Sequence, residues 1–255
     1  MAMNTSPLYK YRCVNKPLIE SIINREIYFS ALSNISDPTD CQFNLRRSFD
    51  IAIHKTSGKQ QKNLKFYRGA MEGFISALED RIQSFGIWCG SLDANNSLMW
   101  QSHADQHRGI CLRYSFPGNI VKPNPQALIG IHPIEYGNNP VVNWLIDNAE
   151  LIPSLNFSEF PESLIVKLLT SKDQCWEHQR EGRVISLNFG SKKIAQARLQ
   201  QICFGLNTPI RDQALMLRIL KQQQYEVTAC RIVRDKNDFG LALKQLDTKE
   251  LAALY

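Results

Sequence analysis

The pattern of apolar and polar positions predicts short strands and amphipathic helices interspersed along the chain. The clearest helix is predicted from Asn63 to Phe85, where apolar residues recur at steps of three and four, the spacing of one helix face. We assign this apolar stripe to the core. Further helices are predicted at Leu18 to Asn24, Ser97 to Ala104, Val141 to Leu151, Ser158 to Thr170, and from Thr208-Pro209 to Gln223. Strands are predicted at Leu8 to Cys13, Ile27 to Ser30, Ile87 to Cys89, Ile110 to Tyr114, Leu128 to Tyr136, Val184 to Leu187, Gln200 to Phe204 and Glu226 to Val233.

Because strands and helices do not alternate strictly, this order of elements favours an α+β fold over a doubly wound parallel sheet. We predict a mixed, largely antiparallel sheet with flanking helices. With 255 residues and 44% hydrophobic content, the chain can bury a full core. We therefore predict a single domain, residues 1–255, with helical insertions at 45–85 and 137–171.

Composition narrows the classes of protein. No apolar run approaches the roughly 20 residues of a membrane span, and the first residues lack the apolar centre of a secretory signal, so we expect a cytoplasmic protein without membrane contact. The seven cysteines are scattered and form no Cys-x-x-Cys pair, which indicates reduced core thiols. A net charge of +6 suits an anionic ligand such as a nucleotide, or weak nucleic-acid contact. The absence of a Gly-rich phosphate loop and of a Gly-x-Ser-x-Gly motif argues against ordinary kinases, dehydrogenases and α/β-hydrolases.

The segment from Lys172 to Arg183 concentrates functional side chains, with a Trp, three cations, two Glu, two Gln and a His in twelve positions. At strand spacing, Gln179, Glu181 and Arg183 point to one face, so an acceptor, a carboxylate and a cation share one side. Such alternation is also typical of the solvated side of an edge strand, where surface ion pairs are weak. Both interpretations stay open for the segment taken alone.

Two histidines, His103 and His107, have the i, i+4 spacing that places two zinc ligands on one helix face. However, no Glu follows His103 as a zinc hydrolase motif requires, and Gly109 indicates that the helix is ending, so we expect no metal. Two alternatives are that these imidazoles cap backbone carbonyls or pack beside Trp100, and that they meet a polar ligand at a helix-to-strand corner.

Arg12 lies near the end of the first predicted strand, and the strand end Tyr28-Phe29-Ser30 leads towards the loop at Asp37-Pro38. A guanidinium binds a pyrophosphate at two points better than a lysine does. Arg12 could equally be a surface cation, and nothing local separates the two interpretations.

Three blocks of the sequence, taken together, carry a family resemblance. The first is LYKYR with YFSALSNISDPTD, and the second is LMWQSHADQHRGICLRY. The third consists of Lys172, Trp176, Gln179, Glu181 and Arg183. They resemble the bacterial family of domain of unknown function 2971, with its Asn-Asp-Pro-Phe-like loop, its Leu-Trp-x-His-Tyr-Ala-x-x-His-x-Gly-x-Cys block and its Lys, Trp, Glu-x-Glu-x-Arg pattern. The chain departs from these patterns at Ser36, Thr39, Ala104 and Gln179.

A more distant resemblance implies an activity. Arg on a first strand, an aromatic-Ser pair on the next and Gln/Glu-x-Glu on a late strand resemble the Arg-Ser-Glu plan of ADP-ribosyltransferases. The resemblance implies a fold of that kind, with Arg12 on the phosphate or ribose of NAD, Ser30 supporting the nicotinamide pocket, Glu181 catalytic and Gln179 helping to present the acceptor. The full predicted site has Glu181 and Gln179 as catalytic residues, and Arg12, Tyr28, Ser30, His103, His107, Trp176 and Arg183 as cofactor-binding residues.

The leading hypothesis is therefore an NAD-dependent mono-ADP-ribosyltransferase-like enzyme, a toxin or phage-defence effector. It would cleave the nicotinamide–ribose bond and modify an unknown protein or nucleic acid, with NAD as a substrate and no metal. A carboxylate suits this chemistry because it stabilises the oxocarbenium-like centre that develops at the ribose.

Two other classes of function stay open. The alternative to an enzyme is a non-catalytic nucleotide or nucleic-acid binding module, in which Lys172, Arg180 and Arg183 bind phosphate and Trp176 stacks on a base. The third hypothesis is a metal hydrolase built on His103, His107 and Glu181.

Overall fold

The computed structural model describes residues 7–35, 37, 40–116, 128–151, 159–193, 198–236 and 239–252. Its α-helices are α1 (Lys16–Ile23), α2 (Leu45–Lys55), α3 (Gly58–Met71), α4 (Ile75–Gln83), α5 (Ser97–His103), α6 (Pro140–Asn148), α7 (Glu159–Leu169), α8 (Ile210–Gln222) and α9 (Thr248–Ala252). Its strands are β1 (Leu8–Arg12), β2 (Ile27–Ala31), β3 (Gly86–Ser91), β4 (Ile110–Ser115), β5 (Leu128–Pro133), β6 (Glu135–Tyr136), β7 (Ser171–Lys172), β8 (Glu181–Ser186), β9 (Gly190–Lys192), β10 (Arg198–Phe204), β11 (Thr228–Arg234) and β12 (Leu241–Gln245). Two 3-10 helices, η1 (Leu32–Asn34) and η3 (Gln174–Gln179), complete the elements used below.

One large mixed sheet organises the described part of the chain. Its strands run in the order β12-β11-β10-β4-β1-β3-β2-β9, while β8 pairs with β3 on one side and with β5 on the other. The pairs in this sheet are antiparallel except β10 with β11. The short strands β6 and β7 pair in parallel as a separate ribbon. The predicted α+β class with a mixed, largely antiparallel sheet and helices is thereby confirmed.

Local sequence accounts for several helix starts. The side chain of Asn15 accepts from the backbone N–H of Leu18 at the start of α1, with Pro17 in the first turn, as predicted. Asn44 and Asn96 cap α2 and α5 in the same way. These caps satisfy backbone donors that a helix leaves unpaired at its first turn.

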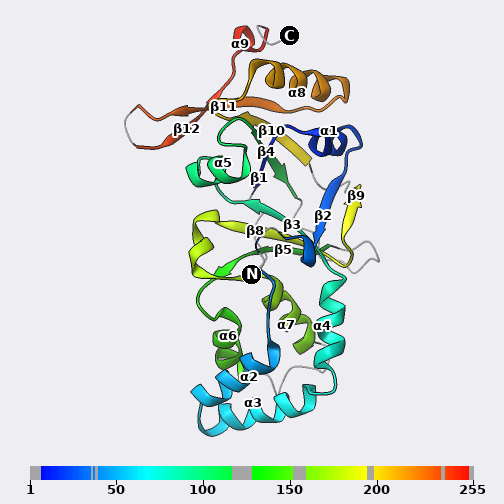
Figure 1. Cartoon of the computed structure of the whole chain (residues 1–255), viewed down its shortest axis with the longest axis vertical. Helices are drawn as coiled ribbons and strands as arrows, with labels where there is room; N and C mark the ends of the chain where they lie inside the picture. The colour runs from blue at the N-terminus through cyan, green and yellow to red at the C-terminus, as the bar shows by residue number, and fades with distance from the viewer. Residues whose placement is uncertain are drawn as a thin grey trace.

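The helices of residues 45–83 and 140–169 gather at one end of the molecule, away from α8 and α9 (Figure 1). Phe49 of α2, Leu64 of α3, Leu145 of α6 and Leu168 of α7 belong to one buried cluster that also includes Ile185 of β8. A second cluster lies between the sheet and helices α1 and α8. The assignment of the two helical segments as insertions into a single domain stays a prediction.

The predicted helix from Asn63 to Phe85 is wrong as a single element. It divides into α3 and α4, with Gly73 and Phe74 in the turn between them. Glycine is about 1 kcal/mol less favourable than alanine in a helix, so Gly73 allows the chain to turn here. Phe74 is consequently 63% exposed, although Leu64 and Met71 of the same predicted stripe are buried.

Other boundaries also differ from the predictions. The strand predicted from Leu128 to Tyr136 divides into β5 and β6 just after Pro133, which has no N–H to donate to a ladder. The strand predicted as the last, Glu226 to Val233, is followed by β12 and α9. Ser36, Pro38 and Thr39 of the predicted functional loop, and Ser158 of a predicted helix start, lie outside the described residues. Within the described ranges, no helix combines the length and apolar character that a membrane crossing requires.

The sheet opens between β1 and β2. Both strands pair with the same edge of β3, β1 at Tyr9↔Ser91 and β2 at Ser30↔Ile87. Between these two points the edge of β3 that contains Cys89 has no ladder partner in the described structure. This opening in the sheet positions the candidate functional site.

Gly109, just before β4, fixes the end of β1. A Cβ atom at Gly109 would lie 2.3 Å from the backbone oxygen of Arg12 and 2.9 Å from that of Ala104. We expect Gly109→Ala to lower the free energy of unfolding by about 1–3 kcal/mol, because two backbone segments must move apart. For a chain of this size that corresponds to a fall in Tm of roughly 5 °C, measurable by thermal denaturation.

Gly69→Ala in α3 is the matched control, since no atom lies within 4 Å of its added Cβ. This control should raise stability slightly, because alanine is the better helix former. Equal melting temperatures for the two variants would contradict the close approach at Gly109.

Candidate functional site

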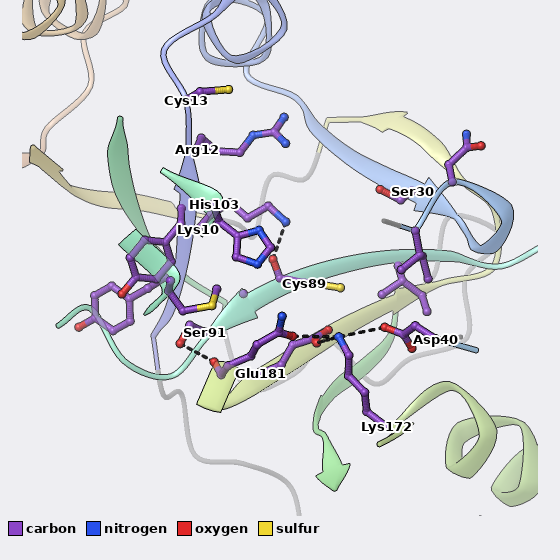
Figure 2. Close-up of a pocket in the computed structure, with 18 residues that line it drawn as sticks. Lys10, Arg12, Cys13, Ser30, Asp40, Cys89, Ser91, His103, Lys172 and Glu181 are labelled. Carbon is purple, nitrogen blue, oxygen red and sulfur yellow. Dashed lines mark hydrogen bonds and ion pairs between the residues drawn. The ribbon is translucent and has the colours of Figure 1, made fainter. Parts of the chain in front are cut away.

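A cavity of about 280 Å³ occupies the opening between β1 and β2. Five of the predicted site residues line it: Arg12, Ser30, His103, Gln179 and Glu181. They come from β1, β2, α5, η3 and β8, which are far apart in sequence (Figure 2). The fold therefore brings the Arg-Ser-Glu set together around one space.

The remaining predicted residues lie outside this cavity. Tyr28 lines a neighbouring cavity of about 400 Å³, which shares Lys10, Arg12 and Ser30 with the first. The ring of Trp176 lies 5.3 Å from Lys172 Nζ, but the residue lines neither cavity. Arg183 is fully buried and also lines neither of them.

His107 is the fourth predicted residue that lies away from the first cavity. It stands in the turn after α5, where its imidazole stacks on Trp100 with ring centroids 6.3 Å apart. Burial lowers the pKa of His107. A Cβ atom at Gly205 would lie only 2.2 Å from the backbone oxygen of His107, so the turn packs closely against the backbone at Gly205. The packing interpretation of this histidine is the one that the geometry supports.

A buried ionic network lies at the floor of the cavity. Arg183 Nε donates to Glu181 Oε1 at 2.7 Å, and Arg183 Nη2 donates to Asp40 Oδ2 at 2.5 Å. Lys172 Nζ lies 3.0 Å from both Glu181 Oε2 and Asp40 Oδ2. Two cations and two carboxylates thus alternate in a closed set, called the ionic network below. Its side chains are at most 7% exposed.

The ionic network also binds neighbouring polar groups. Lys172 Nζ donates to Gln179 Oε1 at 2.9 Å, and Arg183 Nη1 donates to the backbone oxygen of Leu169 at 2.8 Å. The backbone oxygen of Gln179 accepts from Ser91 Oγ at 2.8 Å. The bonds from Lys172 and Arg183 satisfy charged groups that would otherwise destabilise the fold.

The network keeps Glu181 ionised. Burial alone would raise its pKa, but the charges of Arg183 and Lys172 lower the pKa of Glu181 to about 2. Burial would likewise lower the pKa of Lys172, whereas Glu181 and Asp40 raise it above 10.5. Glu181 is therefore an acceptor at neutral pH and has no proton to give.

The solvated edge-strand interpretation of the Lys172–Arg183 segment is wrong. Strand β8 pairs along its length with β3 and with β5, and all six of its residues are buried. Gln179 is not in a strand either, because it ends η3, and Arg180 follows with a left-handed backbone, φ 44°. Gln179 and Glu181 nevertheless share a side, because Lys172 binds both.

Lys10 is a cavity residue that the sequence reasoning did not single out. Its Nζ donates to the backbone oxygen of Cys89 at 2.6 Å and lies 5.2 Å from the ring centroid of Trp88. It thereby satisfies the carbonyl that the open sheet leaves without a ladder partner. Burial and the charge of Arg12 lower the pKa of Lys10. Strand alternation in LYKYR could have identified it, since Lys10 shares a face with Arg12.

Asp40 was missed as well, and its role depends entirely on tertiary structure. It follows the η1 segment and is 4% exposed, with two cations bound to its carboxylate. A single acidic residue in a polar loop has no sequence signal that distinguishes it from a turn former.

Arg12 is a cation without a hydrogen bond or ion pair to any other residue that the structure describes. Its guanidinium lies in the opening, on the side of Ser30 (Figure 2). Because it lines both cavities, it can bind an anion that spans them.

His103 ends α5 and faces the same cavity, close to Lys10 (Figure 2). Burial and then the charges of Lys10 and Lys172 lower the pKa of His103 below 6.5, so the ring is neutral at pH 7. A neutral imidazole can donate to or accept from a hydroxyl.

The geometry argues against the metal hydrolase. Helix α5 ends at His103, and His107 has a left-handed backbone, φ 66°, so the two rings do not share a helix face. Among the residues that the structure describes, no three His, Cys, Asp or Glu side chains are placed to hold a metal ion.

The structure also lacks, in its described part, the open basic groove that the binding-module hypothesis built from Lys172, Arg180, Arg183 and Trp176. Arg183 and Lys172 are buried in the ionic network, while Arg180 lies 3.6 Å from Asp93 with an exposed side chain. These cations and Trp176 therefore do not form one open surface for a nucleic acid.

The pKa of Glu181 implies an acid transition. Because its folded pKa of about 2 lies below the ordinary 4.5, its carboxylate stabilises the fold above about pH 4.5. We expect about 3 kcal/mol of the free energy of unfolding to be lost as pH falls from 4.5 towards 2. Urea denaturation at a series of pH values measures this loss.

Glu181→Gln should be less stable at pH 7 by about 3 kcal/mol, since it leaves two buried cations with one carboxylate, and its stability should depend less on acid pH. The matched control is Glu162→Gln, at an exposed position of α7. An unchanged acid transition in Glu181→Gln would show that other carboxylates cause it.

Comparison of the chain with models of known protein families, with curated proteins and with solved structures gives no match.

Proposed function

We propose that this protein is a mono-ADP-ribosyltransferase-like enzyme with a fold of that kind, which cleaves the nicotinamide–ribose bond of NAD and transfers ADP-ribose to an acceptor. The observation that carries the proposal is that Arg12, Ser30 and Glu181 line one cavity. The resemblance to the bacterial family of domain of unknown function 2971, the cytoplasmic location and a role as a toxin or defence effector belong to the same proposal.

Arg12 supplies the phosphate site. NAD has two nucleosides joined by a pyrophosphate, and the two cavities of about 280 and 400 Å³ meet at Arg12, Lys10 and Ser30. A pyrophosphate at the guanidinium of Arg12 would leave one nucleoside for each cavity. Ligand pockets are commonly about 300–1,000 Å³, so the combined space suits a dinucleotide.

Glu181 would stabilise the transition state. As nicotinamide leaves, positive charge develops at the ribose, and a carboxylate bonded to a ribose hydroxyl stabilises that charge. The two oxygens of a carboxylate accept about four hydrogen bonds in all. Arg183 and Lys172 donate one bond to each oxygen, which leaves room for a ribose hydroxyl.

Two further residues would assist. The neutral ring of His103 can bond a second ribose hydroxyl. Gln179, held at its Oε1 by Lys172, keeps its amide N–H groups for the acceptor. Nicotinamide leaves as a neutral molecule, so the site needs no strong acid, which agrees with the low pKa of Glu181.

A non-catalytic nucleotide-binding module is the second candidate. Both carboxylate oxygens of Glu181 already bind a cation, and this favours a site that binds a nucleotide without cleaving it. This candidate predicts NAD binding without nicotinamide release.

The decisive experiment incubates the purified protein with NAD and follows nicotinamide release by chromatography, together with automodification. We expect Glu181→Gln to reduce the release rate by at least about 100-fold, with NAD affinity changed much less, because the carboxylate acts mainly in the transition state. Since this variant is less stable, the assay is run well below its own melting temperature.

Arg12→Gln should act mainly on binding. We expect it to weaken NAD affinity about tenfold or more through loss of a charge-assisted contact. Arg198→Gln, an exposed position on β10 with the same change of charge, is the matched control and should bind NAD like the wild type. Failure of the wild type to bind NAD by calorimetry, with no nicotinamide released in the presence of protein or nucleic acid, would exclude the enzyme and a module that binds NAD. NAD binding without release would leave the binding module.

A further inference from the structure

The net charge of the chain is concentrated in α2 and α3. Residues 45–71 contain seven Lys or Arg against a single carboxylate, Asp50, which gives +6. The whole chain also carries +6, so the other residues hold equal numbers of both signs. Protein surfaces normally mix the two signs, and such a local excess creates a positive field.

Few of these cations are neutralised by carboxylates. Arg46 pairs with Glu72, and Arg68 pairs with Glu72 and Asp50. Lys65 donates to the neutral amide oxygen of Gln61 at 3.4 Å. No carboxylate partner exists within the described residues for four more cations: Arg47, Lys55, Lys59 and Lys62.

Helix α3 turns its basic side outward. Lys59, Lys62 and Phe66 have i, i+3, i+7 spacing and so share one face, with Lys65 beside them. The opposite side carries Leu64, which is buried in the core of the helical end. Phe66 is 68% exposed, so an aromatic ring stands among three lysines.

We propose that this face of α3, formed by Lys59, Lys62, Lys65 and Phe66, binds single-stranded nucleic acid. The lysines contact phosphates, and Phe66 stacks on an unpaired base, which is the common plan of sites for single strands. Helix α3 has 14 residues and is about 21 Å long, so several phosphates of one strand can follow it.

A membrane surface is a poorer partner for this face. Helices that lie in a membrane interface bury a broad apolar side in the lipid. In α3 the apolar residues Leu64 and Met71 are turned into the protein core, and Phe66 alone among the named face residues is apolar.

The nucleic-acid face lies in the helical end of the molecule (Figure 1). Asp40, which lines the first cavity, is followed closely in sequence by the start of α2 at Leu45. The inference goes beyond NAD cleavage and stands without it, so it is tested in the absence of NAD.

The test is a fluorescence-anisotropy titration of the full chain with a labelled, mixed-sequence single-stranded oligonucleotide of about 20 nucleotides, between about 50 and 200 mM salt. In the variant Lys59→Gln/Lys62→Gln/Lys65→Gln we expect affinity to fall at least tenfold. The slope of log K against log salt should become shallower by about 2, since each phosphate contact contributes about 0.7. Phe66→Ala should weaken binding about tenfold with an unchanged slope, because stacking releases no counterions.

The matched control is Arg211→Gln/Arg218→Gln/Lys221→Gln, which removes three exposed cations from α8, a helix of similar length. It should bind within about twofold of the wild type. Equal losses in the two triple variants would overturn the proposal in favour of a general effect of net charge. Equal affinity for a duplex of the same sequence, or preferential binding to phosphatidylserine vesicles, would also overturn it. Because all the substituted side chains are exposed, thermal denaturation should show an unchanged Tm for each variant.

Discussion

The burial of Arg183 is the constraint on which the rest of the site depends. A guanidinium that is fully excluded from water is strongly destabilising unless carboxylates and other acceptors surround it. Glu181 on the same strand, Asp40 before α2 and the backbone oxygen of Leu169 at the end of α7 meet this requirement together. The ionic network therefore joins the sheet to the helical end, and it holds Glu181 in one orientation.

This arrangement has a direct chemical consequence. The contacts that keep Glu181 in place also remove its ability to act as an acid, because two cations hold it ionised. Reactions in which a carboxylic acid must protonate a leaving group do not suit such a residue. A reaction that needs a fixed negative charge beside a developing cation does, since a preorganised charge requires no reorganisation in the transition state.

Much of the fold followed from the sequence, whereas the organisation of the site followed only in part. Strands and helices were predicted correctly where the apolar period was clear, as at β1, β4 and α8. The prediction was wrong at Gly73, where a turn interrupts an apolar stripe. Gln179 and Glu181 were predicted to share a side for the wrong reason. Strand alternation does not apply to Gln179, and the shared partner Lys172 brings the two side chains together. Asp40 could not be predicted, because the two cations that it binds are more than a hundred residues away in sequence.

The cavity itself exists because the sheet is incomplete. Continuous pairing of β1 with β3 would close the space, yet an open edge leaves the Cys89 carbonyl without a ladder partner, which is costly in a partly buried position. Lys10 resolves this conflict, since its ammonium group lies over the ring of Trp88 and donates to the Cys89 carbonyl in place of the missing backbone donor. A lysine used in this way adds positive charge beside Arg12, so the same residue that stabilises the open sheet also makes the opening attractive to an anion. The structural need of the sheet and the charge of the site therefore have one origin, the placement of Lys10 and Arg12 on the same face of β1.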